Sequence, residues 1–136
     1  MCGQLEERIM KRFSIKTKSR TDFINITSEV SGAVSDMGLN DGVATVFVPH
    51  TTAGITINEN ADPDVLADME HALERVVPWN ANYRHGEGNA AAHVKASMMG
   101  SAVRVIVENG RLKLGTWQSV FFCEFDGPRS RNVWVS

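Results

Sequence analysis

The sequence HTTAGITINENADP, residues 50–63, joins a predicted strand to a predicted helix. Residues 54–57 continue a strand after a kink near Pro49 and His50. Asp62-Pro63 predicts the start of a helix, because aspartate can cap free backbone N–H groups and proline suits the first helical position. Polar and ionisable groups are denser here than a strand needs in order to fold. The segment therefore predicts a functional site where a strand ends and a helix follows.

The elements around this segment can be assigned from hydrophobic periodicity and end signals. The helix that follows it ends at Pro78 and has one apolar face, made of Val65, Leu66, Met69, Ala72, Leu73 and Val76. Two more helices are predicted, over 28–37 after a Thr27 cap and over 90–99 after an Asn89 cap. Further strands are predicted at 11–18, 43–48, 103–107, 111–114, 118–125 and 132–135.

The order of elements is a strand, a helix, two strands, two helices and then a run of strands. This order predicts one α+β domain over residues 1–136, with helices packed on one side of a largely antiparallel or mixed sheet. Asn109-Gly110 predicts a tight hairpin between two of the later strands. Residues 1–10 are expected to form a loosely ordered lead-in. About seven strands in so short a chain leave edges that must be covered, so a homo-oligomer is expected.

Composition excludes several classes of protein. The 136 residues carry a formal net charge of -2, without the basic excess that proteins use against nucleic acid, so nucleic acid is not an expected partner. No apolar run predicts a membrane span, and no signal peptide is recognisable. Only Cys2 and Cys123 are present, so a disulfide framework is not indicated and a cytoplasmic protein is expected. Cys123 follows an apolar run and is predicted to be buried and inert.

Three histidines lie in polar clusters and are candidate metal ligands. His50 opens the segment quoted above, His85 lies in a Gly-rich loop, and His93 lies one turn into a helix. Three neutral imidazoles with an open position would suit zinc or a similar divalent ion. No local spacing such as HExxH links them, and hydrogen-bonded structural histidines are the alternative. His71 lies mid-helix, away from the apolar face, and is interpreted as solvated.

Carboxylates supply the candidate acids, bases and oxygen ligands. Glu59 lies between two asparagines after an apolar strand, where it could act as a general base or a hard-metal ligand. Asp68 lies one turn after Asp64 and is a second candidate, with a solvated surface residue as the alternative. Glu87, between two glycines, is interpreted as either a mobile loop ligand or a solvated charge.

Candidate anion-binding residues occur in three segments. Gly88 and Asn89 lead into a helix N-terminus, where backbone N–H groups can bind phosphate. Arginine suits bidentate phosphate contacts, which makes Arg129 and Arg131 candidates, with an internal Asp–Arg pair as the alternative. Three further side chains could donate to the same ligand or serve only the strands: Thr51, Thr52 and Gln118.

Together these blocks resemble the YjbQ-like family, described in places as secondary thiamine-phosphate synthases. The resemblance covers residues from about 45 to the end of the chain, with the blocks in the family's order. Its motifs are His50-Thr51-Thr52-Ala53, Asn58-Glu59-Asn60-Ala61-Asp62-Pro63, Asp68, Tyr83 with His85, Glu87-Gly88-Asn89, His93, Gly115-Thr116-Trp117-Gln118 and Glu124-Phe125-Asp126-Gly127-Pro128-Arg129.

The resemblance implies a homotrimeric α+β domain with a pocket around His50, His85 and His93, near a subunit boundary. It also implies a weak thiamine-phosphate synthase activity, which joins a pyrimidine pyrophosphate to a thiazole phosphate and expels pyrophosphate. Such a reaction calls for a divalent ion, zinc or magnesium, on the leaving group and for donors around it. Arg129 and Arg131 could supply the donors around the leaving pyrophosphate. The ligand expected from the resemblance is a small phosphorylated molecule.

Three functional interpretations remain. In the first, the protein is an enzyme in which the three histidines hold a metal and Arg129 holds the anion. Glu59 or Asp68 is then the acid/base, and His85 is counted with the catalytic residues. In the second, the same pocket binds a metal or a phosphorylated metabolite without catalysis. In the third, the polar clusters only stabilise a trimer, since buried polar groups must be paired.

Overall fold

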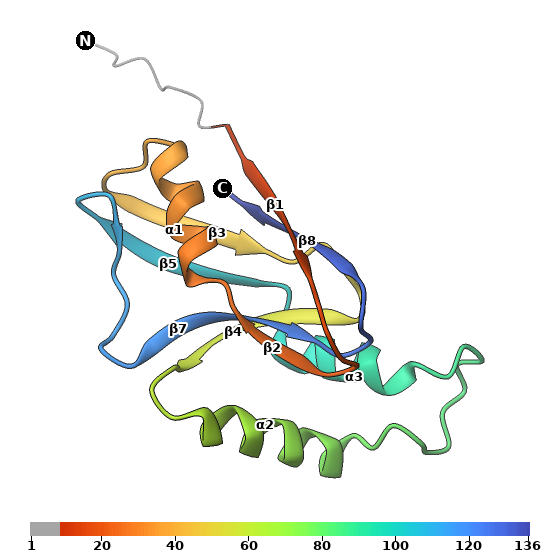
Figure 1. Ribbon diagram of the computed structural model, residues 1–136. Coiled ribbons are helices and arrows are strands. Elements are labelled where there is room, and N and C mark those ends of the chain that lie inside the picture. The colour runs from red at the N-terminus through yellow and green to blue at the C-terminus, as the bar shows by residue number, and fades with distance from the viewer. Residues whose placement is uncertain (1–8) are drawn as a thin grey trace.

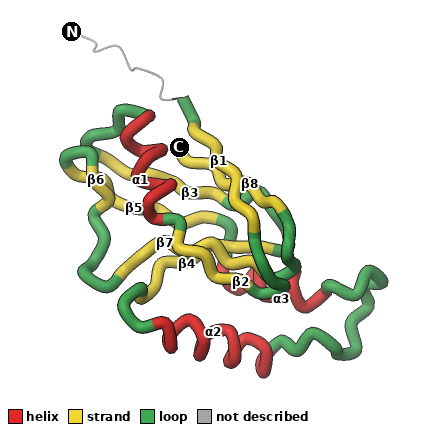
Figure 2. Tube along the Cα trace, in the orientation of Figure 1, coloured by secondary structure: helices red, strands yellow, loops and turns green. Residues whose placement is uncertain are grey.

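The computed structural model describes residues 9–136, so the predicted lead-in at 1–10 lies largely outside the described residues. Figure 1 shows the helices and strands in their spatial arrangement, and Figure 2 separates them from the loops. The helices are α1 (Thr27–Asp36), α2 (Pro63–Val76) and α3 (Ala90–Met99). The strands are β1 (Lys11–Lys16), β2 (Asp22–Asn25), β3 (Gly42–Phe47), β4 (Ala53–Glu59), β5 (Ala102–Glu108), β6 (Arg111–Leu112), β7 (Gln118–Glu124) and β8 (Ser130–Val135).

The strands form two sheets, and every strand pair in the described residues is antiparallel. The five-stranded sheet has the order β1-β8-β3-β5-β6, and the three-stranded sheet has the order β2-β7-β4. Alternation along each strand of the larger sheet turns one set of side chains inward, as Val105 and Val107 of β5 illustrate. The predicted α+β class and single domain are confirmed, with the strands divided between two sheets.

The main core lies between the inner faces of the two sheets. Val120 and Phe122 of β7 and Ile55 of β4 pack there against buried residues of β3, β5 and β8. Helix α1 closes the same core with its buried residues Val30, Ala33 and Val34. A second, smaller core lies on the other face of β7, where Cys123 and Phe125 meet Leu73 of α2 and Ala92 and Ala96 of α3. The central strand β7 is therefore buried on both faces.

The ends of several elements follow the expected turn and cap chemistry. Asp62 caps α2 by accepting a hydrogen bond from Asp64 N at 2.9 Å. Asn109 and Gly110 have φ angles of 52° and 76°, as a tight hairpin requires. The Thr27 prediction is wrong, because Ile26 occupies the N-cap position. The Thr27 hydroxyl instead accepts from Val120 N at 2.9 Å and so ties α1 to β7.

Strand β2 was not predicted, because four residues are too few to show a periodicity. It forms because its partner β7 offers a free edge, to which Phe23 pairs opposite Cys123 and Ile24 opposite Phe122. Tertiary context thus decides the structure of this segment.

Glycine is required in β4 where the end of α3 approaches it. A Cβ atom on Gly54 would lie 2.8 Å from Gly100 O and 2.9 Å from Met99 Cβ, closer than atoms can pack. Ile55 N donates to Gly100 O at 3.1 Å, so this contact also carries a backbone hydrogen bond. The absence of a side chain at Gly54 therefore lets α3 lie directly on the sheet.

Replacing Gly54 by alanine is expected to lower the free energy of unfolding by about 1–3 kcal/mol, because the added methyl group overpacks the β4–α3 contact. Urea denaturation followed by circular dichroism measures this change. Gly32→Ala is the matched control, since a Cβ there meets nothing within 4 Å in helix α1 and alanine favours the helix. Equal effects of the two substitutions would contradict this interpretation of Gly54.

Candidate functional site

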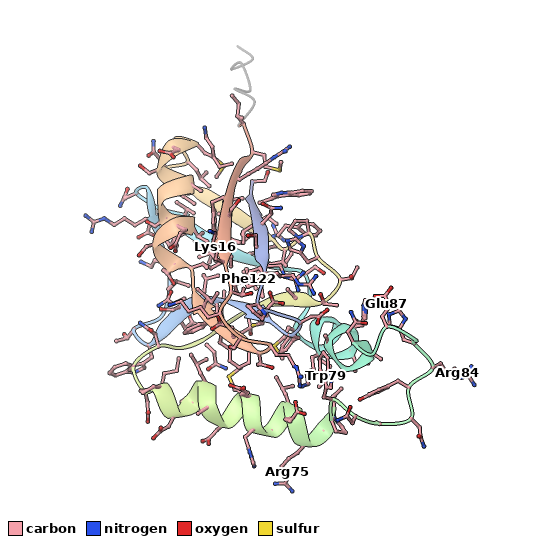
Figure 3. The ribbon with its side chains drawn as sticks, turned by 45° about the vertical axis from the view of Figure 1, so that its right-hand side comes forward. Lys16, Arg75, Trp79, Arg84, Glu87 and Phe122 are labelled. Atoms are coloured by element: carbon pink, nitrogen blue, oxygen red, sulfur yellow. The ribbon has the colours of Figure 1, made fainter. Side chains whose placement is uncertain are left out.

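A polar pocket of about 390 Å³ lies where β4 begins and β7 ends. Three connections meet there: the segment between β3 and β4, the loop into α3, and the turn between β7 and β8. Figure 3 shows Glu87 beside the start of α3 and Arg84 further out along the same loop. The lining residues are Pro49, His50, Thr51, Thr52, Glu87, Asn89, His93, Asp126, Arg129 and Arg131.

The floor of the pocket is a buried ion pair between Glu124 and Arg131. Glu124 is 0% exposed and Arg131 is 4% exposed. Arg131 Nε donates to Glu124 Oε1 at 2.8 Å, and Arg131 Nη2 contacts Glu124 Oε2. The same Nη2 donates to the Thr52 hydroxyl at 2.8 Å, which connects the pair to the start of β4.

Glu124 is held ionised by the donors around it. The Thr17 hydroxyl donates to Oε1 at 2.9 Å, and the backbone N–H groups of Phe125 and Asp126 donate to Oε2 at 3.1 and 3.0 Å. Burial alone would raise the pKa of Glu124, but the hydrogen bonds from Arg131, Asp126 and Thr17 outweigh it and hold the pKa below its usual value. Charge and hydrogen bonds are therefore both satisfied inside the pair.

His50 is fixed by a backbone donor. Asn132 N donates to His50 Nε2 at 2.8 Å. Burial lowers the pKa of His50, and the nearby Arg131 lowers it further. The imidazole is therefore neutral at neutral pH, and its Nε2 is occupied as an acceptor.

His93 lies where the polar pocket meets two neighbouring cavities. One, of about 370 Å³, is lined mainly by the apolar parts of Tyr83, His85 and Val94 and by other residues of that segment. The other, of about 310 Å³, shares His50 and Thr51 with the polar pocket. The rings of His85 and His93 meet edge to face, with centroids 5.2 Å apart. His93 is thus accessible from three directions.

Asn89, Asp126 and Arg129 form a connected group in the pocket lining. Asn89 Nδ2 donates to Asp126 Oδ2 at 2.9 Å, and Arg129 Nη2 lies 3.2 Å from the same oxygen. Arg129 remains half exposed, with a side-chain exposure of 49%. Asn89 Oδ1 is buried and has no hydrogen-bond partner in the described part of the chain. A buried acceptor of this kind calls for a donor, which a ligand or a water molecule can supply.

The predicted metal centre does not fit this arrangement. Within residues 9–136, no group of three His, Cys, Asp or Glu side chains is placed to hold a metal ion. His50 cannot bind a metal through Nε2 while that atom accepts from Asn132 N. His85 is not among the residues that line the polar pocket, and its Nε2 atom lies 3.8 Å from Glu87 Oε2. One chain therefore does not bring the three predicted ligands together.

Three predicted site residues lie away from the pocket. Ala53, at the pocket end of β4, pairs with Glu124, whereas Glu59, at the other end, pairs with Gln118. Six residue steps along a strand span about 20 Å, so Glu59 and Gln118 are that far from the pocket. Gln118 Oε1 accepts from Gly115 N at 2.8 Å and stabilises a turn. Asp68 is exposed on α2, also outside the pocket lining.

The other predicted residues do come together. Seven of them line the pocket: His50, Thr51, Thr52, Asn89, His93, Arg129 and Arg131. Gly88, with φ 81°, provides the turn into α3 next to them. Arg131 is engaged with Glu124 and Thr52 in the pocket floor, and its role as an anion ligand stays a prediction. Sequence analysis missed Thr17, because it reaches Glu124 across 107 positions and no local pattern indicates that contact.

The fold and the pocket define a class of small α+β proteins in which two antiparallel sheets and three helices frame a polar site containing histidine. Within that class, a family model described as UPF0047 protein YjbQ-like matches residues 11–136, and the chain belongs to this family. The resemblance noted from the sequence is confirmed. The thiamine-phosphate activity associated with it stays a prediction.

Relatives match over nearly the whole chain. The UPF0047 protein YugU of Bacillus subtilis (strain 168) is 53% identical, over 93% of this chain and 97% of that protein. A crystal structure of an uncharacterised conserved YjbQ/UPF0047 protein from Clostridium acetobutylicum is 56% identical, with a TM-score of 0.91 and coverage of 93% and 98%. A hypothetical protein from Aeropyrum pernix K1 is 34% identical, with a TM-score of 0.89 and coverage of 94% and 96%.

No helix among the described residues is both long and apolar enough to cross a membrane.

Replacing Glu124 by glutamine is expected to lower the free energy of unfolding by about 3–5 kcal/mol, because Arg131 is left as a buried, unpaired charge. Urea denaturation at neutral pH measures the loss. Glu108→Gln is the control, because its pair with Lys113 is exposed and should contribute less than about 1 kcal/mol.

The same variant tests the lowered pKa of Glu124. A lowered pKa in the folded state adds stability that is complete above the ordinary glutamate pKa and is lost as the pH falls through the lowered value. The wild-type free energy of unfolding should therefore fall on acidification more steeply than that of Glu124→Gln. Parallel pH profiles would contradict an ionised Glu124.

Proposed function

We propose that the polar pocket binds the phosphate or pyrophosphate group of a small molecule and that the protein is an enzyme acting on that molecule. The observation that carries the proposal is the convergence of His50, Thr51 and Arg129 on one pocket next to the buried Arg131. Arginine and neutral N–H or O–H donors are the groups that recognise phosphate oxygens. Non-catalytic binding of the same ligand is the alternative.

Arg129 is the principal anion ligand in this proposal. Its Nε donates to Asp126 O at 2.9 Å, and its Nη2 lies 3.2 Å from Asp126 Oδ2, which together orient the guanidinium at the pocket rim. Arg131 is paired with Glu124 and is only 4% exposed, so it holds the floor in place. Arg129 is also paired, with Asp126, but its side chain is 49% exposed, which leaves N–H groups of the guanidinium open to a phosphate.

His93 is the proposed acid/base. Its ring nitrogens have no hydrogen-bond partner among the described residues, and its side chain faces the polar pocket and both neighbouring cavities. An imidazole whose ring nitrogens are open to a ligand suits general acid–base catalysis. His85 packs against its edge and is proposed to orient it. The reaction class that follows is transfer or hydrolysis at a phosphorylated centre.

Thiamine-phosphate synthesis is one reaction of this class. A ring nitrogen of the thiazole phosphate would form a C–N bond to the pyrimidine methylene, and the C–O bond to pyrophosphate would break. The pocket donors would then stabilise the departing pyrophosphate. A divalent ion that arrives with the pyrophosphate is part of this proposal, but no residue set of one chain is assigned to hold it.

Replacing Arg129 by alanine is expected to weaken binding of inorganic pyrophosphate roughly tenfold or more, because a charge-assisted contact is lost. Isothermal titration calorimetry at constant ionic strength measures the affinity. Arg75→Ala is the matched control, since Arg75 lies on the exposed side of α2 (Figure 3) and should leave the affinity unchanged. An equal loss in both variants would indicate binding by net charge alone.

Replacing His93 by alanine is expected to reduce turnover by about 10²–10⁴, as removal of an acid/base group does. Phosphate monoesters, pyrophosphate esters and the two thiamine-phosphate precursors are the substrates to screen. Pyrophosphate affinity should change little, and His71→Ala, on the exposed surface of α2, should behave as wild type. Tight pyrophosphate binding without turnover of any screened compound would favour the non-catalytic alternative.

We also propose that the chain assembles as a homotrimer through the outer face of the five-stranded sheet. That face carries exposed Val43, Phe47 and Ile106, of which Ile106 is 60% exposed. Phe47 stacks on Trp134 with centroids 5.8 Å apart, and Arg12 lies over the same indole. The Thr45–Arg104 pair lies between Val43–Ile106 and Phe47 on this face, and exposed apolar side chains gathered among polar ones support a protein–protein interface.

Replacing Ile106 by lysine is expected to dissociate the oligomer, because a charge would be buried without a partner. Size-exclusion chromatography with light scattering measures the mass. Val76→Lys, at an exposed apolar position of α2, is the control and should leave the mass unchanged. A monomeric wild type would contradict the assembly, and a trimeric Ile106→Lys variant would place the interface elsewhere.

A further inference from the structure

We propose that His50 is a permanent hydrogen-bond donor to the ligand anion, through Nδ1–H, and serves neither as a base nor as a metal ligand. The inference rests on the proposed anion pocket and assigns a specific role to one of its residues. The donor role of His50 differs from the acid/base role proposed for His93, although both residues line the same pocket.

The position of His50 is set by the end of a sheet ladder. Thr45 exchanges two backbone hydrogen bonds with Ser136, and β3 then pairs with β8 at Val46↔Val135 and Phe47↔Trp134, after which the pairing ends. On its other side, β8 continues to pair with β1, where Asn132 lies opposite Ser14. The N–H of Asn132 no longer has a strand partner on the β3 side, and His50 Nε2 accepts it at 2.8 Å. The imidazole thus completes the ladder where β3 leaves it.

This hydrogen bond decides which ring nitrogen carries the proton. A nitrogen that accepts from a backbone N–H must offer its lone pair, so Nε2 is unprotonated. A neutral imidazole then has its proton on Nδ1. Binding a metal through Nδ1 would require the neutral ring to lose its only N–H proton or to move it to Nε2, and acting as a base would require Nε2 to give up the Asn132 N–H.

Nδ1 is free to serve a ligand. It has no hydrogen-bond partner among the described residues and is not one of their buried, unsatisfied atoms. The side chain lines the pocket together with Thr51 and Arg129. Burial and the neighbouring Arg131 favour the neutral ring, which agrees with a fixed donor. Three residues with donors of different kinds therefore line the one pocket.

The tautomer can be measured directly in the wild-type protein. Two-bond ¹H–¹⁵N correlation spectra distinguish a protonated ring nitrogen from an unprotonated one. We expect His50 to show a protonated Nδ1 and an unprotonated Nε2 at neutral pH, with signals that added zinc does not perturb. A protonated Nε2, or zinc-dependent loss of the His50 signals, would overturn the inference.

The ligand contact can be tested by titrating inorganic pyrophosphate into His50 variants. His50→Ala should weaken binding roughly tenfold, because one donor to a charged group is lost. His50→Asn should recover most of that loss, since the asparagine amide places an N–H close to the position of Nδ1. Circular dichroism and the mass of the oligomer show whether each variant keeps its fold.

The outcomes separate this inference from the function on which it rests. If wild type binds pyrophosphate and Arg129→Ala weakens it while His50→Ala does not, the donor role of His50 is wrong and the anion pocket stands. If wild type does not bind pyrophosphate, the proposed function and the ligand contact of His50 both fail. An affinity restored by His50→Asn, together with a protonated Nδ1, supports the inference.

Discussion

The buried pair of Glu124 and Arg131 is the interaction on which the site depends. It joins the end of β7 to β8, and through Thr17 and Thr52 it reaches the end of β1 and the start of β4. Four segments far apart in the sequence are thereby held at one point. Taking two charges out of water is costly, and the cost is offset here because the carboxylate oxygens are fully hydrogen-bonded.

Much of the fold follows from local sequence. Asp62-Pro63 begins α2 and Asn109-Gly110 closes a hairpin, because both depend on short-range backbone chemistry. The division into two sheets could not be predicted, because it depends on which strands pair across the whole chain. Strand β2 forms only because β7 offers it an edge. The Thr27 hydroxyl accepts a hydrogen bond from Val120 N of β7 and does not cap its own helix.

The candidate site was predictable in part. Polar clusters in the sequence indicated His50, Asn89, His93 and Arg129, and these four residues line one pocket, although their roles stay predictions. The same density of polar groups also indicated Glu59, which lies at the other end of β4, about 20 Å from the pocket. Arginine chemistry alone could not show that Arg131 is engaged by Glu124. Residue types indicated which chemistry each side chain can perform. The register of the strands determined which of these side chains lie close together.

The most direct test is a crystal structure of the protein grown with inorganic pyrophosphate. The account predicts an anion within hydrogen-bonding distance of the Arg129 guanidinium and of His50 Nδ1, with Arg131 still paired to Glu124. An anion bound elsewhere, or an Arg131 that leaves Glu124 to bind it, would contradict the account.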